Sequence, residues 1–73
     1  MRIETLTRMA QQIAINNEGV GECEAIERVA KHLKTFWTSA MVDELRGYAR
    51  GHADELDPVV LGALERLQAQ HQV

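Results

Sequence analysis

The side chains best suited to chemistry in this sequence are one cysteine and three histidines, which are common ligands of transition metals. They are Cys23, His32, His52 and His71, and they stand 9, 20 and 19 residues apart. A zinc site usually takes two of its ligands from positions only a few residues apart, and no such pair occurs in this sequence. The spacing therefore predicts histidines at or near the surface and a small buried thiol, with no metal site.

Other kinds of catalytic site find little support in the residues. Cys23 stands between Glu22 and Glu24, whose negative charges disfavour the thiolate that a nucleophile requires. The glycines within residues 19–21 lack the preceding strand and the further glycine of a phosphate-binding loop. Adjacent carboxylates elsewhere in the chain are typical of solvated helix faces, so we expect no catalytic residue on this chain.

A basic and aromatic stretch offers a different function, the binding of nucleic acid. Residues 32–41 read HLKTFWTSAM and hold two of the three aromatic residues, and Arg28, Lys31 and Lys34 lie in or just before this stretch. The net charge of −3 opposes such binding, because affinity for phosphate needs a basic surface. A small helical regulator that binds nucleic acid through these three basic residues is kept as the alternative function.

The length of 73 residues limits what the chain can be. A domain of this size buries only about 60% of the surface that its unfolded chain exposes, and many such domains rely on a partner or on self-association. The single cysteine excludes an internal disulfide, and no apolar run has the length of a signal peptide or a membrane helix. We therefore expect one soluble, cytoplasmic helical domain over residues 1–73.

Four segments with the periodicity of amphipathic helices predict an all-α fold. They run over about residues 3–16, 22–37, 39–50 and 58–70. Thr38 or Ser39 can cap the third helix, and Asp57 followed by Pro58 is a typical start for the fourth. The connections between these segments are short, which favours a small antiparallel bundle of three to four helices.

The adjacent rings of Phe36 and Trp37 cannot share one seam of a helix, since successive residues lie about 100° apart around the axis. On a helical wheel Phe36 lies at one edge of the apolar stripe and Trp37 at the other, with Leu33 between them. We therefore predict that Phe36 packs in the core. Trp37, near Ala30 and the flexible Met41, is either a core residue or an anchor for another protein, and we expect it to be the main contact with a partner.

Three segments together resemble the delta subunit of NAD-dependent formate dehydrogenase. They read LTRMAQQIA at 6–14, VAKHLKTFWTSAM at 29–41 and LDPVVLGALERL at 56–67, and they cover nearly the whole chain in the order of the family. The matching positions are Arg8, Met9, Ala10, Gln12, Ile13, His32, Phe36, Trp37, Met41, Pro58, Ala63, Leu64 and Leu67. The chain departs from the family pattern at Gln11, where asparagine is usual, and at residues 38–40, where an acid, a proline and an arginine are frequent.

The resemblance implies a companion subunit that does no chemistry itself and supports the assembly or stability of a soluble cytoplasmic complex. The implied partners are a large alpha subunit, which carries a molybdenum or tungsten bis-pterin guanine dinucleotide centre and iron–sulfur clusters, and subunits that carry FMN, further clusters and the NAD site. This chain itself would hold no cofactor and contact no membrane. A homo-oligomer of the isolated chain is a further alternative. The residues that we expect to bind the partner are Arg8, Gln12, His32, Lys34, Phe36, Trp37 and Met41.

Overall fold

The computed structural model of this chain describes the backbone of residues 2–71 and the side chains of residues 2–68. Within this part the chain forms four α-helices, α1 (Ile3–Asn16), α2 (Glu22–Phe36), α3 (Ser39–His52) and α4 (Pro58–His71), with a short 3-10 helix, η1 (Ala53–Glu55), after α3. No strand occurs among these residues. The predicted all-α fold is confirmed. α2 ends one residue earlier than the sequence suggested, and α3 ends two residues later.

Side-chain caps begin α3 and α4. Thr38 Oγ1 accepts a hydrogen bond from the backbone N–H of Met41 at 3.2 Å, and Asp57 Oδ1 accepts one from the backbone N–H of Val59 at 2.8 Å. Each cap satisfies an N–H group that the first turn of a helix leaves without an internal partner. The sequence predicted both caps, and the structure selects Thr38 over Ser39 for α3.

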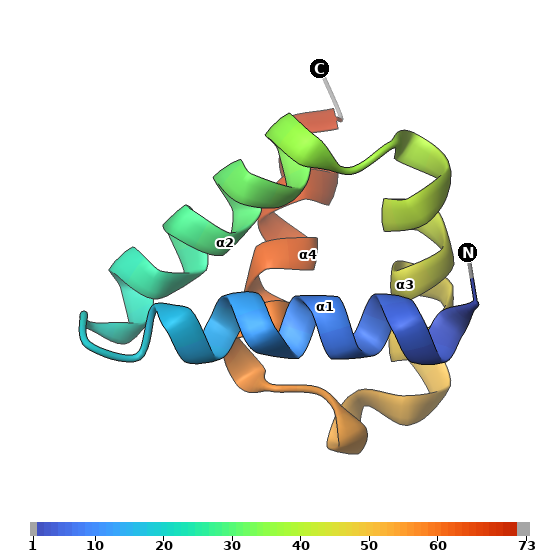
Figure 1. Cartoon of the computed structure of the whole chain (residues 1–73). Coiled ribbons are helices and arrows are strands. Elements are labelled where there is room, and N and C mark those ends of the chain that lie inside the picture. The colour runs from blue at the N-terminus through green and yellow to red at the C-terminus, as the bar shows by residue number, and fades with distance from the viewer. Residues whose placement is uncertain (1, 72–73) are drawn as a thin grey trace.

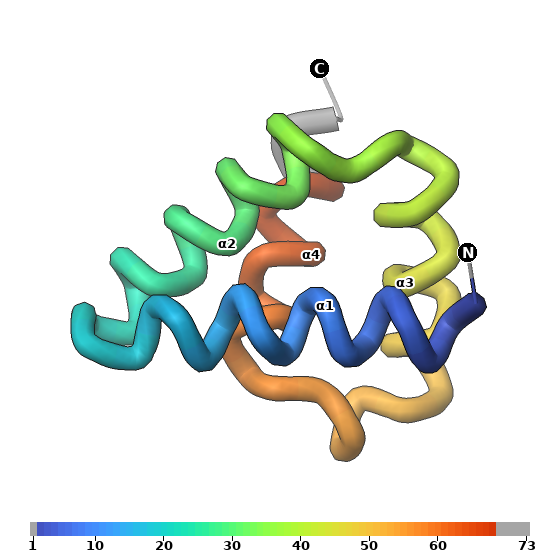
Figure 2. Tube along the Cα trace, in the orientation of Figure 1, coloured from blue at the N-terminus to red at the C-terminus, as the bar shows by residue number. Residues whose placement is uncertain are grey.

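The four helices are splayed rather than aligned along one axis (Figure 1). α1 and α2 meet at their connecting loop and diverge from it, and α3 lies at the open end of the V that they form, as both the ribbon and the tube show (Figures 1 and 2). Consecutive helices run in opposite general directions, which confirms the predicted antiparallel arrangement. The non-consecutive helices α2 and α4 form the most extensive contact between described elements.

The core lies where the four helices face one another. Leu6 of α1, Leu33 and Val29 of α2, Leu45 of α3 and Val60 of α4 are its most completely buried large residues. The other members of the core are Ala10, Ala14, Ala30, Trp37, Val42, Leu56, Ala63, Leu64 and Leu67. Several of these residues are alanines, whose small side chains let neighbouring helices approach one another.

Gly62 allows α4 to approach α2 closely. A Cβ atom at this position would stand 2.7 Å from Cδ1 and 3.0 Å from Cγ1 of Ile26. Carbon atoms pack favourably at about 3.5–4.0 Å, so any side chain at position 62 would require Ile26 to shift. The missing side chain of Gly62 is therefore one physical reason for the close contact between the two helices.

Phe36 and Trp37 do not take the positions that the helical wheel assigned to them. Phe36 was expected in the core but is 71% exposed, and Trp37 is buried with only 7% of its surface exposed. The prediction for Phe36 is therefore wrong. The wheel assumes that both residues are helical, whereas α2 ends at Phe36 and Trp37 has extended backbone angles, with φ −97° and ψ 146°. The chain turns at this point and carries the Trp37 ring into the core.

Phe36 lies uncovered at the end of α2 from which α1 has diverged. Ala25 lies close to Phe36 in angle on the same edge of the α2 wheel, and it is buried near the loop where α1 and α2 meet. Phe36 lies at the opposite end of α2, where α1 has moved away (Figure 1). One edge of a single helix is thus covered at its beginning and open to solvent at its end.

Candidate partner-binding surface

The end of α2 presents two aromatic rings in contact on the surface of the protein. Phe36 is the last residue of α2, and His32 lies one helical turn before it. Both side chains are exposed, their ring centroids are 4.8 Å apart and their planes are inclined by 45°, which is a typical geometry for interacting rings. We call these two residues the aromatic pair. The contact with His32 restricts the positions that the exposed Phe36 ring can take.

The aromatic pair has the properties of a contact for another protein. Aromatic residues are enriched among those that contribute most to binding, and their hydrophobic surface becomes favourable when a partner covers it. The buried Trp37, directly after Phe36, anchors the backbone of the pair to the core. A side chain already held in place loses less conformational freedom when it binds.

Arg8 and Gln12 lie on the outer face of α1, away from the aromatic pair in sequence and on a different helix. Both are exposed, and Ile15, at 46% exposure, lies on the same side of the helix. Gln12 Nε2 donates a hydrogen bond to Asn16 Oδ1 at 3.2 Å. No hydrogen bond or ion pair within residues 2–68 joins Arg8 or Gln12 to the aromatic pair, so the structure brings together only part of the set that the sequence suggested.

Trp37 and Met41 lie behind the surface rather than on it. Trp37 belongs to the core, and Met41 is partly buried and packs against that core. The hydrogen bond from the Met41 N–H to Thr38 fixes the turn between α2 and α3. These two residues therefore offer little surface in this chain and support the end of α2 from within.

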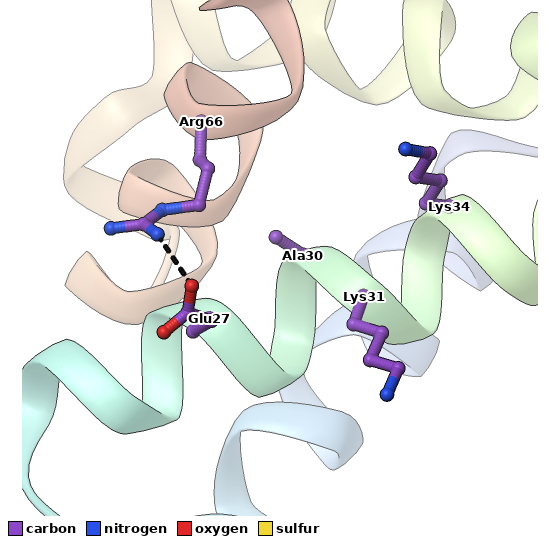
Figure 3. Close-up of a pocket in the computed structure, with 5 residues that line it drawn as sticks. All are labelled: Glu27, Ala30, Lys31, Lys34 and Arg66. Carbon is purple, nitrogen blue, oxygen red and sulfur yellow. Dashed lines mark hydrogen bonds and ion pairs between the residues drawn. The ribbon is translucent and has the colours of Figure 1, made fainter. Parts of the chain in front are cut away.

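Lys34 belongs to a groove between α2 and α4. Glu27, Ala30, Lys31, Lys34 and Arg66 line this groove, which we call the α2–α4 groove (Figure 3). Arg66 Nη1 forms an ion pair with Glu27 Oε1 at 2.9 Å and so connects the two helices. The groove could not be recognised from the sequence, because Glu27 and Arg66 stand 39 residues apart. The sequence does show that the four lining residues of α2 share one flank of that helix, since they are spaced three and four residues apart from Glu27 to Lys34. It does not show that α4 faces this flank.

The basic residues of the nucleic-acid alternative do not all serve one site. Arg28 forms an ion pair with Glu24 at 3.5 Å along the surface of α2, and it does not line the α2–α4 groove with Lys31 and Lys34. The third base of that groove is Arg66, which is already paired with a carboxylate. The structure thus adds no support for nucleic-acid binding through Arg28, Lys31 and Lys34.

The side chains of residues 2–68 do not suit a metal site. No three histidine, cysteine, aspartate or glutamate side chains among them lie close enough to hold a metal ion. Cys23, which we expected to be buried, is exposed in the first turn of α2, so the prediction of a buried thiol is wrong. Among the described residues, no helix combines the length and the apolar character needed to cross a membrane.

Tyr48 forms the other aromatic contact, near the end of α3. Its ring stacks on His52 with centroids 4.2 Å apart and planes inclined by 6°, and its hydroxyl donates a hydrogen bond to Glu55 Oε1 at 3.0 Å. This hydrogen bond, with the negative charge of Glu55, raises the pKa of Tyr48 above its ordinary value. The hydroxyl, which is protonated at neutral pH as in any tyrosine, acts as a donor that ties α3 to η1.

Comparison with known proteins adds one finding to this geometry. The family model described as NADH-dependent formate dehydrogenase delta subunit (FdsD) matches residues 5–64. The matched part contains all of α2 and α3, most of α1 and the first half of α4. No curated protein and no solved structure matches the chain.

Proposed function

Since this chain belongs to the NADH-dependent formate dehydrogenase delta subunit family, we propose that it is a non-catalytic companion of that enzyme, which supports the assembly or stability of the complex. It does so by binding a larger subunit, in the first place the alpha subunit, through helix-mediated contact. The observation that carries this proposal is the exposed Phe36, held against His32 at the end of α2.

Phe36 is the central contact of the proposed interface. Covering a side chain of this size contributes about 1.5–3 kcal/mol, which corresponds to a factor of about 10 to 150 in affinity. His32 lies at its edge and is covered with it. Trp37 and Met41 act from inside the chain by holding the end of α2 in position, and Lys34 lies on the other flank of the same helix. Arg8 and Gln12, on the outer face of α1, form a second patch that meets the partner outside this centre.

The cofactors of the enzyme are held by other subunits in this proposal. The molybdenum or tungsten centre, the iron–sulfur clusters, FMN and NAD all need donor sets or deep pockets, and the described side chains do not provide a group of three metal ligands. We assign the chemistry of formate oxidation to those subunits. We place that complex in the cytoplasm, as the resemblance to this family implies.

The proposal is tested by purifying the enzyme from cells that express all of its subunits, with and without this chain. Mass analysis of the intact complex is expected to find the chain bound to the larger subunits. Formate-dependent NAD reduction per milligram of enzyme, or the stability of the complex on storage, is expected to fall when the chain is deleted. A complex of unchanged composition, activity and stability without the chain would contradict the proposal.

A further inference from the structure

The α2–α4 groove carries an uneven charge. Three of the five residues that line it are basic, Lys31, Lys34 and Arg66, and one is acidic, Glu27. Glu27 is already paired with Arg66 at 2.9 Å, whereas neither lysine takes part in an ion pair between described residues. The groove therefore presents two lysine charges that no carboxylate of residues 2–68 offsets at contact distance.

The concentration of lysine at this place is unusual for the chain. Lys31 and Lys34 are the only two lysines in the sequence, and the net charge is −3. Both lysines are exposed and stand one turn apart on α2. In Figure 3 the Lys34 side chain lies on the side of α2 that faces α4, whereas the Lys31 side chain extends from the border of the groove and its amine points away from α4. A protein of negative net charge thus has a local cluster of basic side chains beside the contact between α2 and α4.

The shape and the chemistry of the groove suit a peptide segment better than a small ion. Ala30 contributes only a methyl group to the lining, which leaves an apolar space between the charged side chains. The guanidinium of Arg66 has several N–H donors, and Glu27 pairs with Nη1 alone. A partner carboxylate in the groove can therefore meet Lys34 and the remaining donors of Arg66, and a neighbouring carboxylate can meet Lys31 at its outer border.

We propose that the α2–α4 groove binds an acidic surface segment of the formate dehydrogenase, with aspartate or glutamate carboxylates paired to Lys31 and Lys34. This inference rests on the proposed function, since it specifies the chemistry of the same docking event. Charges at the rim of an interface act mainly on the rate of association and on its dependence on salt. The groove thus steers and orients the chain, while Phe36 provides the apolar contact that holds it.

Chemical cross-linking tests the pairing directly. A carbodiimide joins an amine to a carboxylate only when the two are in contact, and the amines of this chain are those of Lys31, Lys34 and the N-terminus. Treatment of the complex is expected to link Lys31 or Lys34 to aspartate or glutamate residues of a larger subunit. The double variant Lys31→Arg/Lys34→Arg keeps the positive charges, so it is expected to bind normally and to lose these cross-links.

Charge reversal tests the role of the groove in binding. Lys31→Glu/Lys34→Glu is expected to slow association with the enzyme about tenfold at low salt and to reverse its salt dependence, because added salt then screens a repulsion between glutamates and the acidic segment. The matched control is Arg2→Glu/Arg50→Glu, which changes the net charge equally, from −3 to −7, at two exposed positions outside the groove. Helix content and thermal unfolding of both variants, measured by circular dichroism, show whether they remain folded.

The outcomes separate the two proposals. If the wild-type chain binds the enzyme, but its lysines form no cross-link to a larger subunit and both charge-reversed variants bind alike, the groove assignment is overturned and the companion function stands. If the wild-type chain does not bind the enzyme, the companion function fails and this inference fails with it. Salt-sensitive binding of a mixed-sequence DNA duplex that is lost only in the lysine variant would overturn the acidic segment in favour of nucleic acid.

Discussion

Phe36 and Trp37 are neighbours in the sequence, yet the first is 71% exposed and the second only 7% exposed. The backbone leaves the helix between them, since Phe36 is the last residue of α2 and Trp37 is extended. One ring therefore faces solvent at the tip of a helix while the other fills the core under the turn to α3. The two residues have different tasks, and their substitutions are expected to have different effects.

Replacement of Trp37 by alanine is expected to remove most of the stability of the chain. Truncation of a buried Trp to alanine costs about 3–5 kcal/mol, and the total stability of small domains is only about 5 kcal/mol or a little more. Urea unfolding followed by circular dichroism measures this change, with Trp37→Phe as the milder control. A Trp37→Ala chain as stable as the wild type would show that the ring does not support the core.

Replacement of Phe36 by alanine is expected to leave folding almost unchanged. Surface substitutions usually alter the free energy of unfolding by less than about 0.5 kcal/mol. The single tryptophan of the chain is buried beside this position, so its fluorescence reports unfolding of the variant. A loss of stability similar to that of Trp37→Ala would place Phe36 in the core after all.

Alanine substitutions at Gly47 and Gly62 are expected to have different effects on the stability of the fold, although both glycines lie in helices. At Gly47 nothing lies within 4 Å of an added Cβ, so Gly47→Ala is expected to raise stability by about 0.5–1 kcal/mol through helix propensity. At Gly62 the added Cβ meets Ile26 Cδ1 at 2.7 Å, so the Ile26 side chain must move, which offsets part or all of the same gain. Urea unfolding is expected to rank Gly47→Ala above Gly62→Ala. Equal stabilisation by both would contradict the close approach of α2 and α4.

The hydrogen bond between Tyr48 and Glu55 predicts a loss of stability at alkaline pH. Because the hydrogen bond to Glu55 raises the pKa of Tyr48 in the folded chain above its ordinary value of 10.0, the folded state favours the protonated phenol. The hydrogen bond therefore contributes fully to the stability of the fold below pH 10, and this stabilisation is lost as the pH rises through the raised pKa of Tyr48. Thermal unfolding from pH 8 to 11 is expected to show a steeper decline for the wild type than for Tyr48→Phe. Parallel curves would show that the hydrogen bond does not affect folding.

The helices could be predicted from the sequence because their signals are local. The apolar periodicity marked each helix, and the Thr38 and Asp57 caps lie within three residues of the N–H groups that they satisfy. The match to residues 5–64 likewise confirms the family that three short segments had suggested. Patterns of this kind depend on neighbours in the chain, so no tertiary structure is needed to recognise them.

The surfaces could not be predicted in the same way, because they depend on where helices meet and part. A wheel for residues 22–37 cannot show that α1 diverges from α2 before Phe36, or that the backbone becomes extended at Trp37. The ion pair between Glu27 and Arg66 joins residues from different helices. Both features follow from the packing of α2 with α1 and α4, which no single segment encodes.

Native mass spectrometry tests most directly the proposal that this chain is a companion of formate dehydrogenase and docks through Phe36. The enzyme purified without this chain is mixed with equal amounts of the wild-type or the Phe36→Ala chain. We predict that the wild type adds the mass of this chain to the complex, and that the folded variant does so about 10 to 150 times less tightly. No added mass with the wild type would contradict the companion function, and equal binding of the variant would contradict docking through Phe36.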